Sequence, residues 1–243
     1  MSGLRNWKGL GEQYKMLRAV IFDFDGVITD SEILHLRAFN KVLAQFGCEI
    51  KKKDYYTKYL GYTDIDCYKH LIKDGSLKID KSKIPELVEQ KDHVFKKLAQ
   101  TEGRTIEGVR DFLDLLEQNH IPMAICSGAL LSEIELILDE AKLRPFFQTI
   151  VSAEHVKKGK PHPEGFLRAL KRLNKNRKDQ ISAKQCIVIE DSLWGLQAAK
   201  SAGMHSIAVT NSYEAEQLKL AEKIVDNLKD LSMEDLRLLC ASD

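Results

Sequence analysis

The chain has 243 residues, of which 44% are hydrophobic, and its 37 basic and 36 acidic side chains leave a formal net charge of +1. This balance gives no overall electrostatic attraction to nucleic acid or to a membrane surface, so we expect neither as a partner. No apolar run approaches the roughly 20 residues of a membrane-spanning helix, and we expect no signal peptide at the start of the chain.

The five cysteines are scattered along the chain and lack C-x-x-C spacing. An odd number of cysteines without paired spacing argues against both a disulfide framework and a structural zinc site. Such cysteine usage is typical of a reducing compartment, so we expect a cytoplasmic location. We also expect a monomer whose partner is a small molecule.

The predicted folded region begins at Met16, because the fifteen residues before it contain three glycines and no clear periodicity. Five short runs after this point are apolar or nearly so: Ala19–Phe22, Pro122–Cys126, Thr149–Val151, Cys186–Ile189 and Ser206–Val209. Runs of this kind are typical of strands that are buried on both faces of a parallel sheet. Helical patterns separate them, over residues 108–118, 132–141, 164–173 and 192–202. This alternation predicts an α/β fold with a doubly wound, Rossmann-like parallel sheet.

The interval from Ser31 to Thr105 contains no buried-strand run. Its periodicity predicts helices over residues 32–46, 53–60, 64–73 and 83–100. A helical block after the first strand indicates a separate cap domain. We therefore predict three parts: an N-terminal tail over residues 1–15, a discontinuous α/β catalytic core over residues 16–30 and 106–243, and a helical cap over residues 31–105.

Polar side chains follow three of the strand-like runs. Asp23 and Asp25 follow the first run, Ser127-Gly128 follow the run that ends at Cys126, and Glu190-Asp191 follow the run that ends at Ile189. Each pair alone has an ordinary explanation as a turn or a helix cap. However, the carboxyl ends of parallel strands meet at one edge of a doubly wound sheet, so we expect these groups to lie together.

Together with Lys160, these residues have the chemistry that phosphoryl transfer requires. Carboxylates bind Mg²⁺, which prefers oxygen ligands. An ammonium group, a hydroxyl and backbone amides hold phosphoryl oxygens. One carboxylate is left to attack phosphorus and form an aspartyl-phosphate.

Four segments resemble, in order, the motifs of the haloacid dehalogenase superfamily, in the branch with a helical cap. They are DFDGVITDSE from Asp23, ICSGA from Ile125, KGKPHPEGF from Lys158 and IEDSLWGLQAAKSAG from Ile189. The resemblance extends from Met16 to about Val225, and its first and fourth segments are the most specific.

The resemblance implies a role for each of these residues. Asp23 is the nucleophile, Asp25 is the general acid and base, and Lys160 neutralises Asp23 and the transferring phosphoryl group. Ser127 and Gly128 bind that phosphoryl group. The implied cofactor is Mg²⁺, held by Asp23, Asp25, Glu190 and Asp191. The family's dehalogenases lack the second aspartate, so its presence favours phosphoryl transfer.

Within the family, the segment TDSEILH resembles β-phosphoglucomutase through Ser31 and His35. The mutases carry an arginine in a cap loop that grips a second phosphate, and here Asp64 stands at that position. Because a carboxylate repels a phosphate, we predict a phosphatase for a small phosphorylated metabolite, a sugar phosphate. His35, Gly61 and Thr63 are predicted to contact this substrate.

Two alternatives remain open. One is a hexose-phosphate mutase in which Lys58 or Lys69 replaces the missing arginine. The other is a phosphate-binding or protein-interaction module without turnover. The intact set of Asp23, Asp25, Lys160 and Asp191 argues against a module of this kind.

Overall fold

The computed structural model describes residues 17–59, 62–102 and 105–241. The chain divides into two compact units. Of the described residues, the core unit contains those up to Ile28, Ile106–Ile134 and those from Leu143 onward, and the cap unit contains those within Thr29–Thr105 together with Glu135–Lys142. The domain boundaries and functions assigned from the sequence stay predictions.

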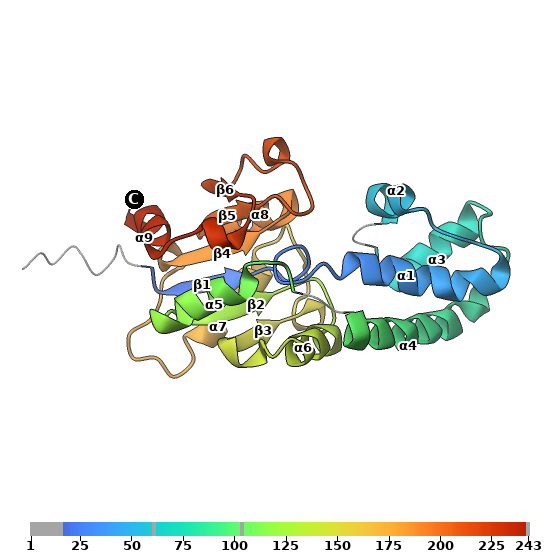
Figure 1. Ribbon diagram of the computed structural model, residues 1–243, viewed down its shortest axis with the longest axis horizontal. Coiled ribbons are helices and arrows are strands. Elements are labelled where there is room, and N and C mark those ends of the chain that lie inside the picture. Colours follow the sequence, from blue (N-terminus) through green and yellow to red (C-terminus); the bar gives the residue numbers. More distant parts are fainter. Residues whose placement is uncertain (1–16, 60–61, 103–104, 242–243) are drawn as a thin grey trace, which may run out of the picture. The chain divides into compact units, whose positions relative to one another are not determined.

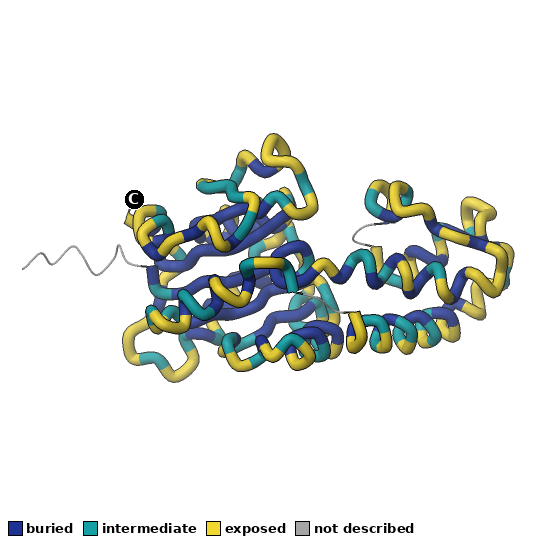
Figure 2. The backbone as a smooth tube through the Cα atoms, in the orientation of Figure 1, coloured by how far each residue is buried: buried dark blue, intermediate teal, exposed yellow. Residues whose placement is uncertain are grey.

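The core unit contains a six-stranded sheet in the order β3-β2-β1-β4-β5-β6, and all neighbouring strands are parallel (Figure 1). The strands are β1 (Ala19–Phe22), β2 (Met123–Cys126), β3 (Phe147–Val151), β4 (Cys186–Glu190), β5 (His205–Val209) and β6 (Lys223–Val225). Every residue of β1, β2, β4 and β5 is buried, as the dark tube in Figure 2 shows. The predicted doubly wound α/β fold is confirmed.

Helices cover both faces of this sheet. They are α5 (Val109–Gln118), α7 (Glu164–Leu173), α8 (Leu193–Ser201) and α9 (Met233–Ala241). A further helix, α6 (Leu131–Glu140), begins in the core unit and continues in the cap unit. Ile21 of β1 belongs to a buried cluster with Phe166 of α7 and Ala198 of α8. Phe22 points to the opposite face, because side chains alternate along a strand, and its ring centroid lies 6.0 Å from that of Phe112 in α5.

The order of the strands places a switch point beside β1. The chain adds β2 and β3 on one side of β1 and β4, β5 and β6 on the other. In sheets of this kind, ligands bind at the carboxyl ends of the strands that flank the switch point. Asp23 lies there, and its backbone N–H donates to the Ile189 carbonyl at 2.9 Å, which continues the β1–β4 pairing by one residue.

The cap unit is helical and has its own hydrophobic core, which includes Phe39, Tyr68 and Leu71. Its elements are α1 (Glu32–Leu43), a 3₁₀ turn (Ala44–Phe46), α2 (Lys52–Asp54), a π-helical turn (Tyr55–Tyr59), α3 (Asp64–Lys73), a second 3₁₀ turn (Lys81–Lys83) and α4 (Ile84–Glu102). An isolated antiparallel bridge pairs Thr29 with Thr105.

The predicted helix over residues 53–60 is wrong in form. The chain makes three residues of α-helix and then the π-helical turn, and it buries Tyr55 and Tyr59. Single π-helical turns of this kind interrupt an otherwise regular helix, and periodicity does not reveal them.

Two further elements, β6 and α9, were not predicted. β6 is an edge strand whose three residues are only partly buried, so it lacks a continuous apolar run. α9 does carry a recognisable signal at its start, where Asp235 N–H donates to Ser232 Oγ at 3.2 Å and Ser232 N–H donates to Asp235 Oδ2 at 2.9 Å. Reciprocal capping of this kind marks a helix N-terminus.

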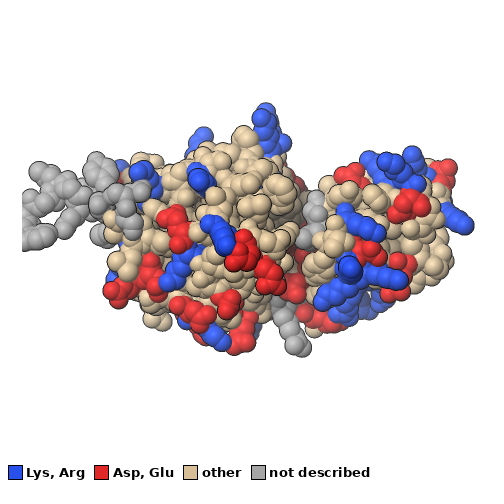
Figure 3. Space-filling model, turned by 90° about the horizontal axis from the view of Figure 1, so that it is seen from above, with Lys and Arg blue, Asp and Glu red and all other residues tan. Residues whose placement is uncertain are grey.

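The surface carries charges of both signs. On the face shown in Figure 3, Lys and Arg side chains are interspersed with Asp and Glu side chains. None of the helices in the described ranges combines the length and apolarity that crossing a lipid bilayer requires.

Close packing between α7 and β2 depends on a glycine. A Cβ atom at Gly165 would lie 2.5 Å from the Sγ atom of buried Cys126. This packing fixes the end of β2, which leads directly into Ser127.

We predict that Gly165→Ala lowers the free energy of unfolding by about 1 kcal/mol or more, because overpacking costs about 1–3 kcal/mol and the gain in helix propensity is at most about 1 kcal/mol. Urea denaturation measures this change. Gly159→Ala is the control, since its Cβ would meet no atom within 4 Å. Equal stability of the two variants would contradict the packing argument.

Candidate active site

Lys160 lies at the centre of the candidate site. Its Nζ atom lies 2.7 Å from Asp23 Oδ1 and 2.5 Å from Glu190 Oε1. Asp23 directly follows β1, Glu190 ends β4, and Lys160 comes from the segment before α7. The two strand ends therefore bring two buried carboxylates together, and the ammonium group between them offsets their repulsion.

The second oxygen of Glu190 is held by the backbone of the following turn. Oε2 accepts hydrogen bonds from the N–H groups of Asp191 and Ser192, each at 3.0 Å, and from Ser192 Oγ at 2.8 Å. A Cβ atom at residue 195 would lie 1.7 Å from Glu190 Oε1, so Gly195 leaves the room that this carboxylate needs. These contacts fix the oxygen that binds Lys160. Direct metal binding by Glu190 stays a prediction.

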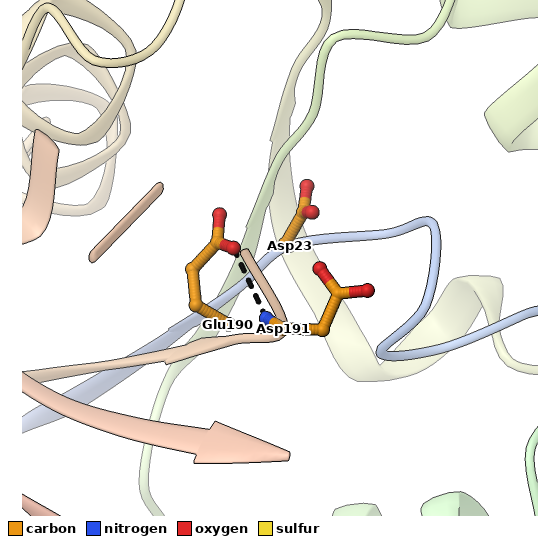
Figure 4. Close-up of side chains that lie close together, drawn as sticks. All are labelled: Asp23, Glu190 and Asp191. Carbon is orange, nitrogen blue, oxygen red and sulfur yellow. Dashed lines mark hydrogen bonds between the residues drawn. The ribbon is translucent and has the colours of Figure 1, made fainter. Parts of the chain in front are cut away.

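Asp191 completes a cluster of three carboxylates. Oxygens of Asp23, Glu190 and Asp191 all lie within 4.8 Å of one another, and Figure 4 shows the three side chains side by side. Gly26 makes room for Asp191, because a Cβ atom there would lie 1.7 Å from Asp191 Oδ2. Gly26 also has a φ of +75°, a conformation that favours glycine.

The cluster carries excess negative charge. Burial raises the pKa of Asp23 to about 7; Lys160 opposes this rise, and Glu190 adds to it. Burial and the charges of Asp23 and Glu190 raise the pKa of Asp191 well above its ordinary value. Burial alone would lower the pKa of Lys160, but the two carboxylates outweigh it and raise that pKa, so the ammonium form persists.

This donor set fits Mg²⁺. Three acidic side chains face one ammonium group, so a divalent cation would neutralise the remaining charge, and carboxylate oxygens are the ligands that Mg²⁺ prefers.

Asp25 is half-buried and lies near enough for its charge to raise the pKa of Asp23. Both aspartates lie beyond β1, which ends at Phe22, and the turn follows at Gly26.

Ser127 and Gly128 lie beside Lys160, and all three line one cavity. The Ser127 N–H donates to the Val151 carbonyl at 2.9 Å, and its Oγ accepts from the Ala129 N–H at 2.9 Å. Within the described ranges nothing accepts a hydrogen bond from the Ser127 hydroxyl. Its proton is therefore available to a ligand oxygen.

The other predicted substrate residues do not belong to this cluster. His35 and Thr63 lie in the cap unit, and Gly61 lies outside the described residues. Thr63 caps α3: its Oγ1 accepts from the Asp66 N–H at 3.1 Å and donates to Asp66 Oδ2 at 2.8 Å. Substrate binding by these residues stays a prediction.

Lys91, a buried cation of the cap unit, was not predicted from the sequence. Its Nζ atom lies 2.7 Å from His35 Nδ1 and 3.0 Å from Asp64 Oδ1, while its side chain is only 1% exposed. Burial, with the Lys91 charge, lowers the pKa of His35 well below its ordinary value, so the neutral ring accepts the hydrogen bond. The signal was its spacing, because Lys91 stands on α4 between buried Leu87 and Phe95 at intervals of four residues.

The pairing with Lys91 reduces the repulsion that Asp64 is expected to exert on a bound phosphate. A neutralised carboxylate repels a phosphate much less than an isolated one, so the sequence argument against a mutase loses force. Lys58 and Lys69, the suggested replacements for the arginine, instead form exposed ion pairs with Asp54 at 2.8 Å and Asp66 at 3.5 Å.

Known proteins resemble this chain in the way that its four motifs suggest. A protein-family model described as "Haloacid dehalogenase-like hydrolase" matches residues 20–209. The chain belongs to this family. The predictions of the family and of a hydrolase are thereby confirmed.

Two bacterial relatives are named as phosphatases. The phosphorylated carbohydrates phosphatase of Thermotoga maritima is 31% identical over 192 residues, which cover 79% of this chain and 84% of that protein. The fructose-1-phosphate phosphatase of Escherichia coli is 30% identical over 205 residues, covering 81% of this chain and 98% of that protein. Among solved structures, a β-phosphoglucomutase from Clostridium difficile matches with a TM-score of 0.75 and 27% identity, over 93% of this chain and 97% of that one.

We predict that Lys160→Met destabilises the metal-free protein by about 3–5 kcal/mol at neutral pH, because it leaves Asp23 and Glu190 buried without their cation. Urea denaturation in EDTA measures the change. Lys200→Met is the control: Lys200 is exposed on α8, and we expect an effect within about 0.5 kcal/mol there. If both variants unfold at the same urea concentration, the ion pairs do not stabilise the site.

Proposed function

We propose that the chain is a Mg²⁺-dependent phosphatase that hydrolyses a small phosphorylated carbohydrate through an aspartyl-phosphate. The observation that carries this proposal is Lys160 held between Asp23 and Glu190, with Asp191 beside them. The named activities of the two bacterial relatives support the substrate class. A cytoplasmic location and a monomeric state stay predictions.

In the first half-reaction, Asp23 attacks phosphorus and the bond to the leaving alcohol breaks. Lys160 holds Asp23 Oδ1, and within the described ranges no donor contacts Oδ2, which is the attacking oxygen in this proposal. Ser127 and the Gly128 N–H bind phosphoryl oxygens, and Asp25 gives a proton to the leaving alcohol.

In the second half-reaction, water replaces the alcohol. Asp25, now deprotonated, takes a proton from this water as it attacks phosphorus. The Asp23–phosphorus bond breaks, inorganic phosphate leaves, and the Asp23 carboxylate is restored. Mg²⁺, held by Asp23, Asp191 and the neighbouring carboxylates, would supply positive charge to the phosphoryl oxygens throughout.

A hexose-phosphate mutase of the β-phosphoglucomutase type is the second candidate. Two observations favour it, namely the similarity to a solved β-phosphoglucomutase and the pairing of Asp64 with Lys91. In this alternative, the aspartyl-phosphate passes to a sugar hydroxyl instead of water.

A turnover screen separates the two candidates. Fructose 1-phosphate, hexitol phosphates and β-glucose 1-phosphate are incubated with the protein and Mg²⁺, and both free phosphate and isomerised sugar are measured. We expect phosphate without isomer, loss of turnover in EDTA and recovery when Mg²⁺ is restored. Isomer with little phosphate would establish the mutase, and no turnover of any compound would contradict both candidates.

We predict that Asp25→Asn lowers kcat for the best substrate by roughly 10²–10⁴-fold, the usual scale of general acid–base catalysis. The amide neither gives nor takes the proton. Asp30→Asn, a change of the same kind at an exposed position of the same segment, is the matched control and should retain its activity. A loss of less than about tenfold in Asp25→Asn would remove the acid–base role.

A further inference from the structure

A cavity of about 460 Å³ opens beside Lys160 on the core unit. Ser127 and Gly128 line part of it, and the segment from Lys157 to Lys160 and Trp194 of α8 line other parts. Small-molecule sites commonly have volumes of about 300–1,000 Å³, so the cavity is large enough for a sugar phosphate. Lys160 belongs both to this cavity and to the Asp23 cluster.

Two lysines, Lys157 and Lys158, are among the residues that line this cavity. Lys157 and Lys158 are exposed, and within the described ranges neither forms an ion pair. Their backbone is nevertheless fixed, because their N–H groups donate to Glu164 Oε1 and Oε2 at 3.1 and 3.2 Å. Glu164 begins α7, so a rigid element holds this segment while both side chains remain available to a ligand.

Trp194 adds an aromatic surface to the same cavity. It is 56% exposed, a large fraction for an indole, although the backbone around it is fixed. The neighbouring Ser192 caps α8 by accepting from the Gly195 N–H at 3.1 Å. An indole offers both an apolar face and an N–H donor, a combination that suits a carbon skeleton bearing hydroxyl groups.

We propose that this cavity is a subsite for a second oxyanion on the substrate. The inference rests on the proposed phosphatase function. The transferring phosphoryl group lies at Ser127 and Lys160, the carbon skeleton lies against Trp194, and a second phosphate or carboxylate binds Lys157 and Lys158. Charge-assisted hydrogen bonds from two ammonium groups select a multiply charged anion. The substrate class is thus a sugar bisphosphate or a phosphorylated sugar acid.

The kinetic test compares a sugar bisphosphate with acetyl phosphate, which has no second oxyanion. We expect the ratio of kcat/KM for fructose 1,6-bisphosphate to that for acetyl phosphate to fall by about tenfold in Lys157→Ala/Lys158→Ala, the scale of one or two hydrogen bonds to charged groups. Lys175→Ala/Lys178→Ala removes two exposed lysines outside the cavity and should keep the wild-type ratio.

A binding test uses the fluorescence of Trp194 directly. The chain has two tryptophans, Trp7 and Trp194, so Trp7→Phe leaves Trp194 as the reporter. In a Trp7→Phe/Asp23→Asn background, we expect fructose 1,6-bisphosphate to change the emission with saturation. The alanine pair at Lys157 and Lys158 should weaken the apparent affinity by about tenfold.

Failure of the proposed subsite and failure of the proposed function give different results in these two tests. If wild-type protein releases phosphate from no compound, acetyl phosphate included, the proposed function is wrong, and the fluorescence titration still tests the subsite. If the enzyme turns over but the ratio of kcat/KM values is unchanged in Lys157→Ala/Lys158→Ala, the subsite proposal is wrong. It is also wrong if the bisphosphate does not change the Trp194 emission. If the double alanine variant changes only the inhibition of turnover by inorganic phosphate, the proposal is wrong as well, since the cavity would then bind free phosphate.

Discussion

The candidate site depends on the placement of one ammonium group between two buried carboxylates. Without Lys160, the charges of the buried Asp23 and Glu190 side chains would repel each other, and the pKa of Asp23, which burial already raises, would rise further. With it, Asp23 has Oδ1 held by the ammonium group, while Oδ2 meets no donor from the described residues. Asp191 then adds a charge that a divalent cation can compensate. The Lys160 ammonium group therefore both offsets the repulsion between the carboxylates and orients the proposed nucleophile.

The fold supplies this placement through its strand order and through small residues. Because β1 lies between β2 and β4, three strand ends deliver their polar residues to one edge. Gly26 and Gly195 then let the carboxylates of Asp191 and Glu190 approach backbone that any side chain would obstruct. Gly165 has the corresponding role between α7 and β2. The site therefore depends on the close approach that these glycines allow as well as on its charged groups.

The fold class and the core cluster were predictable because both follow from local patterns. Apolar runs fix buried strands, and the polar residues at their ends must meet at the switch point. Lys91 was not predicted, since its partners His35 and Asp64 lie far from it in the sequence, although its place in an apolar stripe of α4 was a signal. Reading Asp64 alone gave it an uncompensated charge, which only tertiary structure could correct.

In the proposed mechanism, Asp23 carries the phosphoryl group between the two half-reactions. The most direct measurement quenches the enzyme during turnover, reduces any acyl phosphate with borohydride and maps the modified residue by peptide mass spectrometry. We expect reduction at Asp23, dependent on substrate and absent in Asp23→Asn. Modification at another residue, or none while phosphate is being released, would contradict it.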